Sequence, residues 1–228
     1  MRTTKHLLAV FSCGLLLSAG TASADVGPLS GLTAQWWQLV GSIPTSVNPG
    51  LDKTGADCMV GQRGPVWFLV GTFASGPVTR SCSVPEGAWL FFPVVNDVNI
   101  NTPNVCGQNS ANQSVDFLRS QIAPAVDGAT GLSVHVDGKP VKDVVRVKSL
   151  PFAVTFPADN IFNAPCEAAG LGSVPANTYS PAVDDGFYTL LAPLSVGTHT
   201  LHIQGQIPAV GLTVDVTYNL TVVAVVLK

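Results

Sequence analysis

The chain has 228 residues, 46% of them hydrophobic, and a formal net charge of -3. Eleven basic residues against 14 acidic ones, with no basic cluster, exclude the concentrated positive surface that nucleic-acid binding requires. The 22 glycines and 17 prolines are typical of short strands joined by tight turns, and no apolar run after residue 24 reaches the roughly 18 residues needed to span a bilayer.

The first 24 residues predict a secretory signal peptide. Arg2 and Lys5 precede a short apolar stretch at 7–17, and residues 22–24 are the small side chains that signal peptidase recognises. The mature chain is then expected to be a single domain over 25–228, secreted or periplasmic. Its nine basic and 14 acidic residues give it a net charge of about -5.

Four cysteines remain after the signal: Cys58, Cys82, Cys106 and Cys166. An even number in an exported chain predicts two disulfides, for which three pairings exist. We favour Cys58 with Cys82, since both flank one short predicted hairpin, and Cys106 with Cys166, which would join two loops. No cysteine spacing fits a zinc site.

Two segments have apolar residues at helical spacing, 32–43 and 115–126. Asn112 or Ser114 could cap the second helix, and Pro124 is expected to end or bend it. Both helices are predicted to lie at the periphery of a sheet.

Strands and turns are predicted for nearly all of the remaining chain. Residues 213–222 alternate between apolar and polar side chains over ten positions, which predicts a strand with one buried and one wet face. A long loop is expected at 96–112. The fold class is therefore all-β, an antiparallel β-sandwich or jelly roll, with an immunoglobulin-like arrangement as the alternative. Further strands are expected at 65–73, 78–84, 88–95, 132–136, 141–148, 152–156, 187–191 and 198–204, the first five of them in hairpins or hairpin-like pairs.

Three stretches resemble a group of secreted, β-rich bacterial proteins to which no activity is attached. They are GPVWFLVGTF at 64–73, LFFPVVN at 90–96 and DGFYTLLAPLSVGTH at 185–199. The resemblance implies bacterial export and transfers no functional residue. Separately, the segment 197–201 resembles a late hairpin of immunoglobulin-like bacterial modules.

Oxygen-bearing side chains recur at every second position near the start of the predicted loop. Asp97, Asn99 and Asn101 could direct three oxygen ligands at one calcium ion, with Asp184 and Asp185 completing the site. The pattern is not an EF-hand, because the turn glycine and the closing glutamate are missing. The alternative, which we favour, is a loop whose Asn and Asp side chains bond to their own backbone.

Aromatic residues and amides are the candidates for binding a ligand. Trp37 is turned away from the buried stripe of the first helix, and Trp89 lies beside a turn, so both could stack on a sugar ring. Asn96 and Asn99 could hold its hydroxyl groups. Trp36 and Trp67 are expected in the core.

These observations favour a secreted binding or surface-interaction module for a carbohydrate or cell-envelope polymer. One alternative is a hydrolase or lyase that uses loop carboxylates, drawn from Asp97, Asp184, Asp185 and Glu86. No catalytic residue is assigned, because the chain has no G-x-S-x-G motif, and His199 and His202 would point to opposite faces of one strand. A second alternative is a structural protein that assembles through its apolar final strand.

Overall fold

The computed structural model describes residues 27–73 and 76–224. The predicted signal peptide at 1–24 lies outside the described residues. Two disulfides are present, Cys58–Cys82 and Cys106–Cys166, which confirms both predicted pairings. Disulfides of this kind persist in oxidising compartments outside the cytosol. Within the described residues, no helix is long and apolar enough to cross a membrane.

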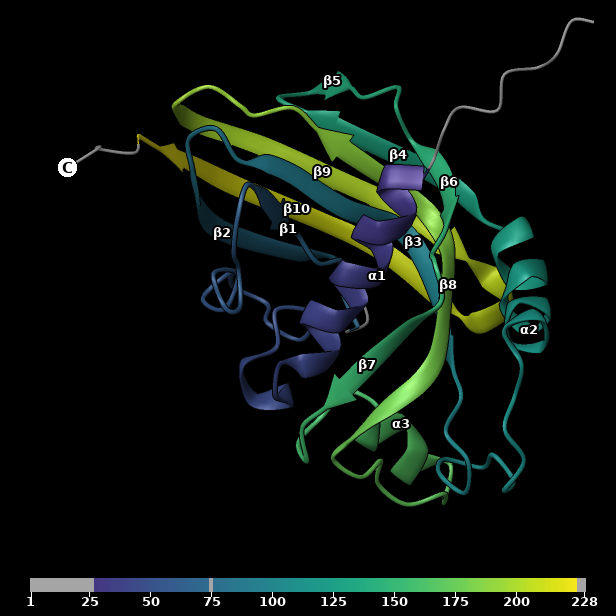
Figure 1. The fold of residues 1–228 in the computed structure, drawn as a ribbon. Coiled ribbons are helices and arrows are strands. Elements are labelled where there is room, and N and C mark those ends of the chain that lie inside the picture. The colour runs from purple at the N-terminus through teal and green to yellow at the C-terminus, as the bar shows by residue number, and fades with distance from the viewer. Residues whose placement is uncertain (1–26, 74–75, 225–228) are drawn as a thin grey trace, which may run out of the picture.

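Two five-stranded sheets form the framework of the described structure (Figure 1). In the first, called sheet A, the strands run in the order β1-β3-β8-β6, and β7 pairs with another part of β8. In the second, called sheet B, the order is β2-β10-β9-β4-β5. The strands of sheet A are β1 (Val66–Phe68), β3 (Trp89–Ile100), β6 (Val145–Lys148), β7 (Phe152–Phe156) and β8 (Asn177–Leu191). The strands of sheet B are β2 (Val78–Pro85), β4 (Thr130–Val136), β5 (Lys139–Pro140), β9 (Gly197–Ile207) and β10 (Leu212–Val223).

Both predicted helices are confirmed. The first is α1, Gly27–Ser42, and the second is α2, Val115–Asp127. The Ser114 hydroxyl accepts a hydrogen bond from the Phe117 amide and so caps α2. Pro124 lies inside α2, which continues to Asp127. The described chain also contains α3 (Asn163–Ala168) and two short 3-10 helices, η1 (Thr45–Val47) and η2 (Pro208–Val210).

The β-rich class is confirmed, but the antiparallel prediction is wrong for two strand pairs. β1 pairs with β3 in parallel, and β2 pairs with β10 in parallel. The consecutive hairpins predicted over 65–95 do not form, because β1 and β3 belong to sheet A while β2 belongs to sheet B. Likewise, β4 pairs with the short β5, and β6 crosses to sheet A. Alternating burial shows that a segment is a strand, but it carries no information about which sheet supplies the partner.

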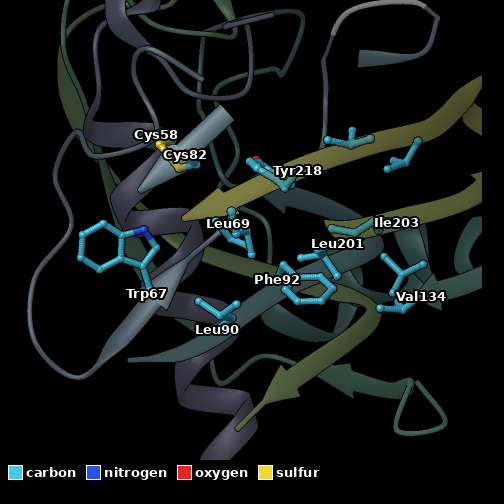
Figure 2. Packing of buried hydrophobic residues seen from close by; sticks show 14 of the residues in the cluster. Cys58, Trp67, Leu69, Cys82, Leu90, Phe92, Val134, Leu201, Ile203 and Tyr218 are labelled. Carbon is cyan, nitrogen blue, oxygen red and sulfur yellow. A yellow bond between two sulfur atoms is a disulfide. The ribbon is translucent and has the colours of Figure 1, made fainter. Parts of the chain in front are cut away.

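The two sheets share one hydrophobic cluster. Figure 2 shows Leu90 and Phe92 of sheet A beside Leu201 of sheet B, with Tyr218 of sheet B nearby. β10 follows its predicted alternation: its buried residues are Val214, Val216, Tyr218, Leu220 and Val222. This strand pairs with β2 over Val216–Val223 and with β9 over Leu212–Val222, so over 216–222 it is an interior strand of sheet B.

A second hydrophobic cluster lies on the other face of sheet A, where α1 packs (Figure 1). Trp36 is buried there, and its indole N–H donates to the Leu69 carbonyl at 2.8 Å. Gly41 allows α1 to approach β7 closely, since a Cβ at that position would lie 2.7 Å from Val154 Cγ2 and 2.9 Å from Phe156 Cε1. This helix and the end of β8 frame the candidate site.

Candidate functional site

The pairing of β3 with β8 brings most of the predicted site residues to one part of sheet A. Asn96 is opposite Gly186, Asp97 is opposite Asp185, and Asn99 is opposite Val183. The loop predicted at 96–112 therefore begins later than expected, because residues 96–100 are the end of β3. Apolar Val98 and Ile100 alternate with the polar residues there, and this alternation is the strand signal that the prediction missed.

Asp184 is fully buried beneath α1, within a closed set of hydrogen bonds. Its Oδ1 accepts from the indole N–H of Trp37 at 2.7 Å and from the Asn96 amide at 3.2 Å. Its Oδ2 accepts from the Tyr188 hydroxyl at 2.7 Å. Burial raises the pKa of Asp184 to about 7 and outweighs these three donors, which favour the charged form.

Asp185 points to the opposite face of sheet A, since neighbouring residues of a strand alternate. Arg146 holds its carboxylate with two hydrogen bonds, of 2.9 and 2.8 Å, and also pairs with Asp127 at the end of α2. These bonds raise the pKa of Arg146. Asp97 lies across from Asp185, and partial burial raises its pKa above the usual range. Asp97 and Asp185 therefore share one face of sheet A, and Asp184 cannot face a common cleft with them.

The predicted calcium ligands make local hydrogen bonds. Asp97 accepts from the Val98 amide at 2.9 Å, and Asn99 accepts from the Ile100 amide at 3.0 Å. Asn101 is buried and bonds to several groups of the loop that follows β3, including the Gln113 amide. Within 27–73 and 76–224, no group of three His, Cys, Asp or Glu side chains could hold a metal ion.

A larger feature is a cavity of about 570 Å³ between α1 and α3, called here the α1/α3 cavity. Its wall combines three aromatic rings, other apolar side chains, and a few carboxylate, amide and hydroxyl groups. The lining residues are Trp37, Thr45, Leu51, Phe73, Asp159, Asn160, Ile161, Phe162, Asn163, Ala164, Pro165 and Glu167. This volume lies within the range of small-molecule binding sites.

Two asparagines fold the segment that forms one wall of the cavity. The Asn160 amide donates to the carbonyls of Pro157 and Val174, both at 2.9 Å. Asn163 accepts from the Val174 amide at 2.9 Å and donates to the Ala158 carbonyl at 2.7 Å. Their amides are thus used to hold the loop, which leaves the neighbouring Asp159 and Glu167 side chains exposed at the cavity.

The opposite wall is held by one asparagine and one buried arginine. Asn48 donates to the Val40 carbonyl at 2.8 Å and accepts from the Gly50 amide at 3.0 Å, which fixes the turn that leads to Leu51. Arg80 is completely buried, and its Nε donates to the Asp52 carbonyl at 2.7 Å. These three hydrogen bonds position the segment that carries Leu51 into the cavity wall.

A second cavity, of about 180 Å³, adjoins the first through Phe162, which lines both. Asn99 and the Cys106–Cys166 disulfide are among its lining residues. Because Cys166 belongs to α3, the disulfide ties this helix to the loop after β3. It thereby fixes the position of α3 at the edge of both cavities.

The four predicted ligand-binding residues do not form one site. Trp37 lines the α1/α3 cavity, Asn99 lines the second cavity, and Asn96 belongs to the Asp184 network. Trp89 lies at the start of β3, 42% exposed and outside the lining of both cavities. Trp36 and Trp67 are buried, as predicted.

Ser195, His199 and Asp137 have the spacing of a catalytic triad at the end of sheet B. His199 Nε2 lies 3.2 Å from Ser195 Oγ, and Nδ1 lies 2.8 Å from Asp137 Oδ2. However, the Ser195 carbonyl oxygen lies 3.0 Å from the same Nε2. Acceptors at both ring nitrogens favour the protonated ring, and the hydrogen bond to Asp137 raises the pKa of His199. With both ring nitrogens facing acceptors, His199 donates two hydrogen bonds and links two turns. A general base needs a ring nitrogen that can accept a proton, so this arrangement is unsuited to that role.

Comparison with known proteins gave no match: no family model, no curated protein and no solved structure matches the chain. Sequence reasoning missed Phe73, Asp159, Phe162 and Glu167, which come from segments that only the folded chain brings together. The one available signal was an aromatic residue beside Asn and Asp in the segment 159–163.

Proposed function

We propose that the protein is an exported bacterial binding module that holds sugar units of a carbohydrate or cell-envelope polymer in the α1/α3 cavity. The observation that carries the proposal is the cavity itself, where Trp37, Phe73 and Phe162 supply flat apolar surfaces beside exposed carboxylates. Flat rings pack on the apolar faces of sugars, and carboxylates accept from their hydroxyl groups.

The proposal includes a location and a scaffold. The predicted signal at 1–24, together with the two disulfides, favours export to the periplasm or the medium. We take the two sheets as a β-sandwich on which loops and helices carry the site. Phe73 is 41% exposed at the cavity, so a ligand can reach this ring from solvent.

The two rival functions have less support. A hydrolase that used the named loop carboxylates would need them in one cleft, but Asp184 and Asp185 lie on opposite faces of sheet A, and Glu86 is exposed on the turn between β2 and β3. Self-assembly through the final strand would need a free edge, and β10 has neighbours on both sides over 216–222.

Co-sedimentation of residues 25–228 with insoluble polysaccharides and cell-wall material, in calcium and in EDTA, tests the proposal. Replacing Phe73 by alanine should weaken binding about tenfold, which corresponds to about 1.4 kcal/mol for a lost aromatic contact. Trp89→Ala is the matched control, because Trp89 is equally exposed but remote from the cavity lining.

Three results would count against the proposal. If no polymer binds the wild-type protein, the module function is wrong. If Trp89→Ala weakens binding and Phe73→Ala does not, the ligand binds at the start of β3 instead. If EDTA abolishes binding, the ligand is held through a metal ion. The cavity has two carboxylates among its lining residues, too few to account for such a metal site.

A further inference from the structure

The charges that line the α1/α3 cavity all have one sign. Asp159 and Glu167 are its ionisable residues, and no lysine, arginine or histidine is among the residues that line it. Both carboxylates belong to residues that are exposed to solvent. An unbalanced pair of acids beside a cavity produces a negative potential, which attracts cations and repels anions.

Aromatic rings in the same wall add to this preference. Trp37 and Phe162 are stacked with ring centroids 6.4 Å apart, and Phe73 is exposed on the same cavity. The face of an aromatic ring attracts an ammonium group through its quadrupole, most strongly for tryptophan. A cavity wall that combines carboxylates with aromatic rings therefore favours an organic ligand that carries an ammonium group.

We infer that the α1/α3 cavity selects an amino sugar, a ring that carries a protonated amine, over neutral and acidic sugars. The inference rests on the proposed function and specifies its ligand class. The ammonium group lies toward Asp159 and Glu167, and the sugar ring packs against the aromatic side chains. Uronic acids and other anionic sugars are excluded by the same two carboxylates.

Calorimetric titration of residues 25–228 at pH 6 and low salt tests the inference. The probes are soluble β-1,4-linked hexamers of glucosamine, of N-acetylglucosamine and of glucose, with choline as a cation that lacks a sugar ring. At pH 6 the amine of glucosamine is charged. We expect the glucosamine hexamer to bind about tenfold more tightly than the neutral hexamers, and this advantage should shrink as salt screens the charges.

The chain offers a closely matched pair of variants, because Glu86 and Glu167 are the two glutamates of the sequence. Glu167→Gln removes one charge from the cavity while keeping its shape, and should reduce the preference for glucosamine about threefold, in line with exposed ion pairs. Glu86→Gln removes an equally exposed charge from a distant turn and should leave all affinities unchanged.

The possible outcomes separate the inference from the function on which it rests. If the neutral hexamers bind as tightly as the glucosamine hexamer, the inference is overturned and the binding module remains. If choline competes as strongly as the glucosamine hexamer, the cavity recognises an ammonium headgroup and the sugar assignment is wrong. If no hexamer binds, the proposed function itself fails at this site.

Discussion

Replacing Asp184 by asparagine should remove most of the pH dependence of folding stability between pH 5 and pH 7. The Asp184 carboxyl is protonated up to about pH 7 in the folded protein, against an ordinary pKa of 3.8. Between these values the folded state binds one proton more than the unfolded state, so stability falls as pH rises. The rise in pKa corresponds to about 4 kcal/mol, of which about 2 kcal/mol is lost between pH 5 and pH 7 and nearly 3 kcal/mol by pH 8.

Urea unfolding at pH 5, 6, 7 and 8 measures this effect. The free energy of unfolding of the wild-type protein should fall by about 3 kcal/mol more than that of Asp184→Asn over this range. In this variant the Tyr188 hydroxyl loses the carboxylate oxygen that accepts its hydrogen bond. The loss should lower the free energy of unfolding by about 1 kcal/mol at every pH. Its profile should therefore cross that of the wild-type protein and lie above it at pH 8.

A matched control is Asp143→Asn, which removes an exposed carboxylate that takes no part in this network. Its pH profile should run parallel to that of the wild-type protein. If the profile of Asp184→Asn also ran parallel, burial would not control the protonation of Asp184, and the reasoning about this network would be wrong.

Three further predictions concern α1, His199 and the two disulfides. Gly41→Ala should destabilise the protein by about 1–3 kcal/mol in urea unfolding, because its Cβ would clash with β7, whereas Gly31→Ala in the same helix meets open space and should not. His199→Gln should lower the free energy of unfolding at pH 6 but change it little at pH 9, because the protonated ring that binds Asp137 is lost as pH rises through the raised pKa of His199. A serine-reactive phosphonate should not label Ser195. Replacing both Cys106 and Cys166 by serine opens a loop of 60 residues and should cost about 4 kcal/mol while weakening ligand binding, whereas loss of the other disulfide should lower stability alone. Equal binding by the two disulfide variants would contradict a role for α3 in the site.

The elements that the sequence predicts well are those whose signal is local. The alternation over 213–222, the helical stripes of α1 and α2, and the Ser114 cap each depend on residues within a few positions of one another. The parallel pairs β1–β3 and β2–β10 could not be predicted in this way. β2 and β10 are more than one hundred residues apart, and nothing in either strand specifies its partner.

The candidate site was predicted less well for a related reason. The position of Trp37 on its helix predicts a binding role, but Phe73 and Phe162 join it only because the segment after β1 and the start of α3 line the same cavity in the folded chain. Asp184 and Asp185 look like two equivalent polar residues in the sequence. Strand alternation sends one to a buried network and the other to Arg146, so their chemistry differs completely.

Hydrogen–deuterium exchange of residues 25–228, with and without the tightest-binding oligosaccharide, tests the central claim most directly. If the α1/α3 cavity holds the ligand, binding should slow exchange in the segments 45–52 and 159–168, which form its two walls, and leave β9 and β10 unchanged. Protection confined to the start of β3 around Trp89, or to the end of sheet B around His199, would contradict the account.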